Sequence, residues 1–184
     1  MKKAKLVLAV ALIILATSAT LLGYSIAAMQ FQGKVNSLEK SIDKMLYAAE
    51  VISVKDHVEA SLYFAQAAIE DKCIIESIEN VLKINLNSTF NTKNFANIVF
   101  LKKLKNDLKS LNETIPPEGN SEIHRQLLAS LKSYVENYEL YIVFLENNTS
   151  CNKLKALLPV LNSNYNKISV VVEIMAKNIV AKNE

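Results

Sequence analysis

The sequence predicts an all-α protein: an up-down-up-down helical bundle preceded by an N-terminal transmembrane or signal helix and a helical stalk. Only three Gly and three Pro occur in 184 residues, which favours a few long helices over many short strands. Apolar residues recur at helical spacing along most of the chain. We expect a basic N-terminus (1–5), a transmembrane or signal segment (6–29), a stalk (30–52) and a bundle (53–184).

Residues 6–29 contain no charged side chain and follow three lysines, Lys2, Lys3 and Lys5. A helix of this length spans about 36 Å, which exceeds the roughly 30 Å hydrocarbon core of a bilayer. Lysines that precede such a segment stay in the cytoplasm, so the body is expected outside. The sequence therefore predicts a single-pass protein of the cell membrane that contacts the membrane through residues 6–29.

The same segment has features of a cleavable signal peptide. Residues 6–16 form an apolar core, and the small residues at 17–19 or 25–27 suit a signal peptidase. Apolar character resumes at Leu21 and continues to Met29, which is longer than a signal peptide needs. Secretion after cleavage is therefore the alternative to an anchor. A pilin-like segment cut near Ala4 is a third, less favoured interpretation.

The stalk carries apolar residues at alternating spacings of three and four, the pattern of a helix that meets a partner helix. This pattern predicts self-association through the stalk or binding of an unidentified protein partner. Residues 53–56 resemble a capping box, with Asp56 at its acidic position, which indicates that a second helix begins there. The alternative is one continuous helix, because nothing else in these residues interrupts the helical pattern. The stalk positions in this pattern are Val35, Leu38, Ile42, Met45, Ala49 and Ile52.

Polar stretches divide the bundle into further helices. Residues 85–94 and 147–150 are rich in Asn, Ser and Thr, whose side chains compete with helical hydrogen bonds. Residues 115–121 contain two prolines that end one helix and Ser121, which is expected to cap the next. Pro159 is expected to kink the last helix or mark its start. Short connections of this kind favour antiparallel neighbours in a bundle.

Cys73 and Cys151 are the only cysteines, and both fall on the side of the membrane where disulfides persist. In the expected topology the first and fourth helices of the bundle are neighbours, which permits the two residues to pair. A bridge that closes a loop of about 78 residues contributes on the order of 4 kcal/mol in the chain-entropy account. We therefore predict a Cys73–Cys151 disulfide.

Four Asn-X-Ser/Thr sequons lie in or beside the predicted loops of the exported body. Exposed loops there can accommodate glycans. The candidate glycosylation sites are Asn87, Asn112, Asn147 and Asn148.

No residue pattern indicates catalysis, a cofactor site or a metal site. His57 and His124 lack the Glu three residues earlier that di-iron bundles use, and we expect both to face solvent. Arg125 is the only arginine, too few for the guanidinium clamps of helical enzymes that bind dicarboxylates or phosphates. The sequence therefore predicts a protein that is not an enzyme.

Charge places a further limit on function. Apart from the three lysines at the start, the chain holds 18 basic and 18 acidic residues and is neutral. Nucleic-acid binding requires an excess of positive charge, so none is predicted. Lysines 102, 103, 105 and 109 form a basic strip on one helix, interpreted chiefly as a solvated face.

Three tyrosines, Tyr134, Tyr138 and Tyr141, share one face of a helix. They are expected to pack in the core with their hydroxyls at its rim, although an aromatic-lined ligand groove is the alternative. The leading functional hypothesis is a membrane-anchored extracytoplasmic bundle that acts as a structural or protein-interaction module. The alternative is a ligand-sensing or solute-binding ectodomain that signals through a partner.

Overall fold

The computed structural model describes the backbone of residues 2–83, 94–147 and 149–181, and side chains of residues 23–83, 95–147 and 149–178. The described residues form four helices: α1 (Lys2–Leu82), α2 (Asn94–Glu113), α3 (Ser121–Glu146) and α4 (Cys151–Ala181). Those ranges contain no strand, which confirms the all-α class. The chain divides into two units, residues 1–44 and 45–184.

The first unit is helical throughout its described residues. No helix among the described residues is both long enough and apolar enough to cross a membrane. The side chains of residues 1–22 lie outside the described set. Most of the predicted transmembrane or signal segment, 6–29, was therefore not included in this comparison with a membrane span.

Helix α1 continues through residues 53–56 without a break. Ser53 does not cap a new helix: its Oγ lies 3.5 Å from His57 Nε2, one turn further along the same helix. Of the two possibilities left open by the sequence, a continuous helix is correct. After Leu82 the backbone leaves the helix at Lys83, whose φ of 55° is the left-handed conformation common at helix ends.

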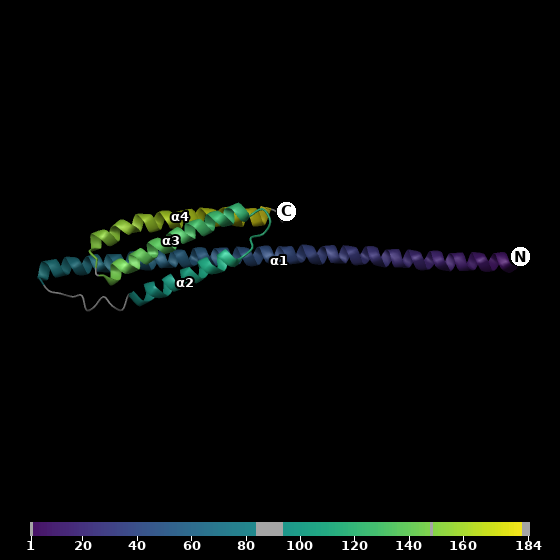
Figure 1. The fold of residues 1–184 in the computed structure, drawn as a ribbon, viewed down its shortest axis with the longest axis horizontal. Coiled ribbons are helices and arrows are strands. Elements are labelled where there is room, and N and C mark those ends of the chain that lie inside the picture. Colours follow the sequence, from purple (N-terminus) through teal and green to yellow (C-terminus); the bar gives the residue numbers. More distant parts are fainter. Residues whose placement is uncertain (1, 84–93, 148, 182–184) are drawn as a thin grey trace. The chain divides into compact units, whose positions relative to one another are not determined.

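The second unit is an up-down-up-down bundle, and its side-chain contacts define the direction of each helix (Figure 1). Asp107 and Ser110 of α2 contact positions 57 and 50 of α1, in reverse order, so α2 is antiparallel to α1. Residues 124 and 134 of α3 contact positions 47 and 61, in the same order, so α3 is parallel to α1. Cys151 and Met175 of α4 lie beside positions 73 and 47 of α1, in reverse order, so α4 is antiparallel to α1 and to α3, against which it packs.

A single apolar core lies between the four helices of the second unit. Tyr47 and Val51 belong to it, so the bundle begins before residue 53, the boundary that the sequence suggested. Ile74, Ile78 and Val81 continue the apolar pattern of α1 but are exposed. The largest fully buried side chains are Tyr134, Tyr138, Tyr141, Ile69, Leu104, Leu111, Leu127, Leu131, Leu154, Leu161, Ile168 and Met175.

The turn predicted at 115–121 connects α2 to α3, but its details differ from the prediction. Ser121 is the first residue of α3, and Asn120 occupies the cap position without a side-chain hydrogen bond to the helix. Gly119 has a φ of 84°, a conformation that a residue with a side chain rarely adopts. Pro159 does not mark the start of α4, because that helix already begins at Cys151.

Candidate functional site: the contacts and exposed surfaces of α1 to α4

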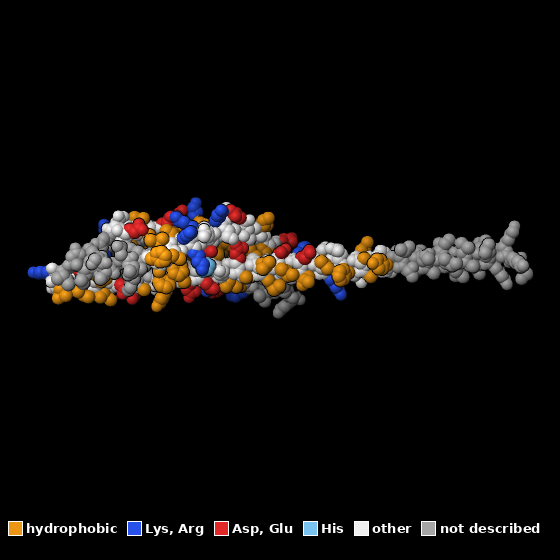
Figure 2. Space-filling model, turned by 90° about the horizontal axis from the view of Figure 1, so that it is seen from below, with side chains coloured by type: hydrophobic (Ala, Val, Ile, Leu, Met, Phe, Trp, Pro, Cys, Tyr) orange, Lys and Arg blue, Asp and Glu red, His pale blue; other side chains and the backbone are white. Residues whose placement is uncertain are grey.

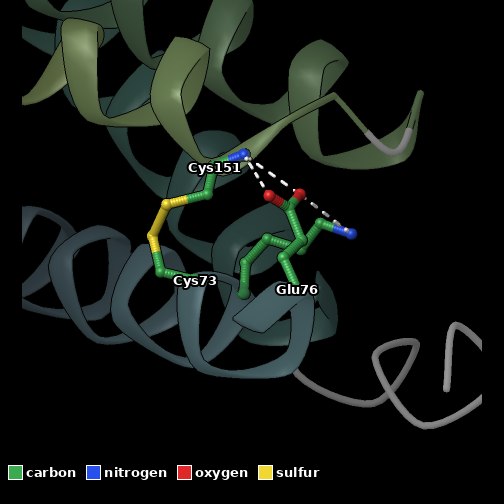
Figure 3. Close-up of a disulfide and its surroundings, with 4 residues drawn as sticks. Cys73, Glu76 and Cys151 are labelled. Carbon is green, nitrogen blue, oxygen red and sulfur yellow. Dashed lines mark hydrogen bonds and ion pairs between the residues drawn. A yellow bond between two sulfur atoms is a disulfide. The ribbon is translucent and has the colours of Figure 1, made fainter. Parts of the chain in front are cut away.

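The predicted disulfide joins α1 to the first residue of α4 (Figure 3). The Cα atoms of Cys73 and Cys151 lie 5.1 Å apart, within the range that a disulfide requires. Both carboxylate oxygens of Glu76 accept a hydrogen bond from the backbone N–H of Cys151, each at 3.0 Å. The N-terminal N–H groups of a helix lack partners within the helix and favour negative charge, so Glu76 caps α4 from α1.

Lys72 completes this end of the bundle. Its side chain is only 4% exposed, and its Nζ lies 3.6 Å from Glu76 Oε1. A buried ammonium is costly without an opposite charge, which Glu76 supplies. The covalent bond, the cap and the ion pair thus fix α4 against α1 in one place.

A hydrogen-bonded cluster fixes α1 further toward its N-terminus. Tyr47 Oη lies 2.7 Å from Nδ1 of His124, and both side chains are buried. Burial lowers the pKa of His124, while a hydrogen bond to the backbone of Leu111 and the nearby Glu50 act in the opposite direction. The neutral imidazole bridges both neighbours if Nε2 donates to Leu111 and Nδ1 accepts from Tyr47.

Glu50 ties α1 to the end of α2 beside this cluster. Ser110 Oγ donates to Glu50 Oε1 at 2.7 Å, and Thr114 Oγ1 lies 3.3 and 3.2 Å from the two carboxylate oxygens. Further along α1, His57 Nδ1 lies 2.7 Å from Asp107 Oδ2 of α2. Each contact joins α1 to another helix of the second unit, so α1 cannot rotate about its axis without breaking several of them.

The prediction that both histidines face solvent was wrong. His124 is buried, and His57 is half-buried against Asp107. His124 precedes Leu127 and Leu131 by three and seven residues, so it lies on the apolar face of α3, a spacing that already indicated burial. In the described part of the chain, no three His, Cys, Asp or Glu side chains gather as a metal site would require.

The three tyrosines of α3 are fully buried, and their hydroxyls lie inside the core rather than at its rim. Tyr134 Oη lies 2.8 Å from Ser61 Oγ, which in turn donates to the carbonyl of Val58. Tyr138 Oη donates to Asn97 Oδ1 at 2.9 Å. Tyr141 Oη has no hydrogen-bond partner among the described residues. Burial raises the pKa of each phenol, so all three are neutral.

Of the candidate glycosylation sites, Asn112 and Asn147 are exposed, on α2 and directly after α3 respectively. Asn87 and Asn148 lie outside the described residues.

A basic groove of about 530 Å³ lies between α2 and α3. Lys105 and Lys109 of the predicted basic strip line it together with Arg125 and Lys132 of α3, over apolar side chains that include Leu108. Lys105 pairs with Glu139, and Arg125 makes two hydrogen bonds to Glu122. Lys109 and Lys132 have no acidic partner in the described chain. The sequence did not indicate that the two helices bring these charges together.

A second groove, of about 770 Å³, lies between α3 and α4. Ala129, Ser130, Ser163 and Asn166 contribute small or amide side chains to it, and Pro159 lies at its edge. It contains one cation, Lys167, and no acidic residue. The groove therefore offers hydrogen-bonding groups but little charge.

Figure 2 shows hydrophobic side chains exposed on α1, and we call the apolar stalk positions, together with Ala28 and Phe31, the seam. Phe31, Leu38 and Ile42 of the first unit are 69%, 61% and 42% exposed. In the second unit Met45 and Ile52 are 57% and 46% exposed, although Tyr47 and Val51 between them are buried. Tyr47 follows Met45 by about 200° around the helix, so within the second unit the bundle covers the face of α1 opposite Met45 and Ile52.

Comparison with known proteins gives no relative: no protein family, curated protein or solved structure matches the chain.

We expect Cys73→Ser to lower the free energy of unfolding of the full chain in oxidising buffer by about 4 kcal/mol, from the chain-entropy account of a 78-residue loop. In reducing buffer the wild type lacks the bridge as well, so the two proteins should unfold at similar temperatures. Thermal unfolding followed by circular dichroism measures both cases. Equal losses in both buffers would mean that the thiol contributes through packing alone.

Two tyrosine variants test the hydrogen bonds of the core. Tyr138→Phe keeps the ring but removes the donor to buried Asn97, so we expect a loss of about 1–3 kcal/mol in the free energy of unfolding. Tyr141→Phe removes a buried hydroxyl without a described partner and should leave stability unchanged or higher. Urea unfolding of both variants measures the difference. An equal loss in Tyr141→Phe would contradict this description of the core.

Proposed function

We propose that the chain is a membrane-anchored extracytoplasmic helical bundle that acts as a structural or protein-interaction module. The observation that carries the proposal is the seam of α1, because it leaves large apolar side chains exposed along several turns of helix. Such side chains are stabilised when a partner removes them from water. The seam also has the alternating three- and four-residue spacing of helices that pack against another helix.

The proposed location outside the cytoplasm rests on two features of the chain. Residues 6–29 are uncharged and follow three lysines, the arrangement of a membrane anchor whose body is exported. Cys73 and Cys151 lie at disulfide distance, which suits an oxidising compartment. A protein secreted after cleavage of the same segment is the alternative location.

The proposal includes no catalytic activity. Four of the polar side chains buried in the bundle join its helices: Tyr47 contacts His124, and Tyr134 contacts Ser61. They lie in the core and line neither of the two grooves described above. A structural role accounts for these four side chains.

The basic groove supports a second candidate function, a ligand-sensing or solute-binding ectodomain. Its volume suits a small molecule, and Lys109 and Lys132 beside an apolar floor would attract an anionic ligand. A small anion that copurifies with the chain and is released by Lys109→Glu would favour this function. The seam is better supported, because lysines on an outer helix face are common without any ligand.

We expect Leu38→Glu with Ile42→Glu to abolish self-association of the full chain in detergent, because it places charge in the seam. The matched control, Asn36→Glu with Ser37→Glu, adds the same charge beside the seam and should behave as the wild type. Sedimentation velocity measures the mass of all three. If the seam variant and the wild type sediment alike, the seam is not an interface between copies.

A further inference from the structure

We infer that the seam joins two copies of this chain in a parallel, in-register coiled coil. The inference rests on the proposed interaction function and specifies its partner, its orientation and its alignment. It follows from the residues of α1 between positions 28 and 45, which all lie in or next to the first unit.

The identity of the seam residues favours two parallel strands. Written as heptads, the seam places Ala28, Val35 and Ile42 at position a, and Phe31, Leu38 and Met45 at position d. β-branched residues at a together with Leu at d favour parallel two-stranded coiled coils. The central heptad of the seam has this combination.

The charges beside the seam determine the orientation. Lys34 occupies position g and Glu39 occupies position e, and both are exposed. In the described part of the chain, neither pairs with an opposite charge. In a parallel coiled coil, position g of one chain faces position e of the next heptad on the other, so Lys34 meets Glu39 of the second copy. An antiparallel pair sets g against g and e against e, which offers these two residues no opposite charge.

The same charges determine the register. The other e positions near the seam are Gln32 and Leu46, and the other g positions are Ala27 and Ser41. A shift of one heptad in either direction therefore sets Lys34 against Gln32 or Leu46 and loses both ion pairs. Only the in-register parallel dimer brings Lys34 and Glu39 together, twice by symmetry.

The apolar pattern of the seam ends after Ile52, within the part of α1 that belongs to the bundle. The next a and d positions after Ile52 are Asp56 and Glu59, both exposed and charged. Like charges from two copies would meet at those positions and oppose pairing. The coiled coil is thereby limited to the part of α1 that precedes them.

Cysteine cross-linking tests orientation and register in the full chain in detergent, with the native disulfide intact. In the inferred dimer each a residue faces its own counterpart, so Val35→Cys and Ile42→Cys should each form a disulfide-linked dimer under mild oxidation. Asn36→Cys, beside the seam, is the control and should not. A single antiparallel arrangement cannot give linked dimers at both a positions. The two-fold axis of an antiparallel pair passes beside only one position of each helix, so a cysteine at no more than one of these positions would meet its own counterpart.

A charge exchange tests the ion pair independently. Lys34→Glu and Glu39→Lys each replace two ion pairs with two like-charge contacts, so each should raise the dimer dissociation constant roughly tenfold at low salt. The double variant, with both changes, restores the pairs and should return the constant to that of the wild type. Sedimentation equilibrium measures all four proteins. A double variant as weak as either single one would overturn the ion pair.

The outcomes separate this inference from the proposed function. A chain that has the mass of two copies but cross-links at neither Val35→Cys nor Ile42→Cys would overturn the parallel register and leave self-association standing. A chain that has the mass of one copy at every concentration would overturn the dimer altogether, and the proposed function would then require a different protein as the partner of the seam.

Discussion

The fixed rotation of α1 is the constraint on which the rest of the structure depends. One group of contacts, the disulfide to α4 and the cap by Glu76, holds it near its C-terminal end. Nearer its N-terminus, α1 is held a second time by the hydrogen bond of Tyr47 to α3 and that of Glu50 to α2. Apolar packing alone tolerates small rotations of a helix, whereas hydrogen bonds and a covalent bond depend on direction. Because two separate levels are held, the face of α1 that meets the core is set throughout the bundle.

This constraint also sets the face that stays outside. Val51 and Val54 are buried while Ile52 between them is exposed, so a single helix presents one apolar face to its own bundle and another to solvent. A helix that is apolar on two sides buries both only if a second partner is present. The charge pattern of the seam, with Lys34 and Glu39 at complementary positions, supports the proposal that this partner is a second copy of the chain. Membrane anchorage of both copies would favour the same parallel orientation.

The sequence predicted much of the fold and less of its polar interior. Helical periodicity and the loop-forming stretches identified the helices, and the topology brought Cys73 and Cys151 together as expected. The expectation that His57 and His124 face solvent is wrong for His124, whose spacing from Leu127 and Leu131 places it on the apolar face of α3. Its buried hydrogen bond to Tyr47 could not be predicted, because Tyr47 lies on a helix far away in the sequence. The basic groove between α2 and α3 could not be anticipated either, since it depends on the rotation of both helices.

The mass of the unaltered chain, extracted from membranes in mild detergent and measured by native mass spectrometry, tests the central claim most directly. The account predicts a complex of twice 20.5 kDa in which each copy retains residues 6–29. A single chain of 20.5 kDa at every concentration would contradict it, because the seam of α1 would then remain exposed without a partner.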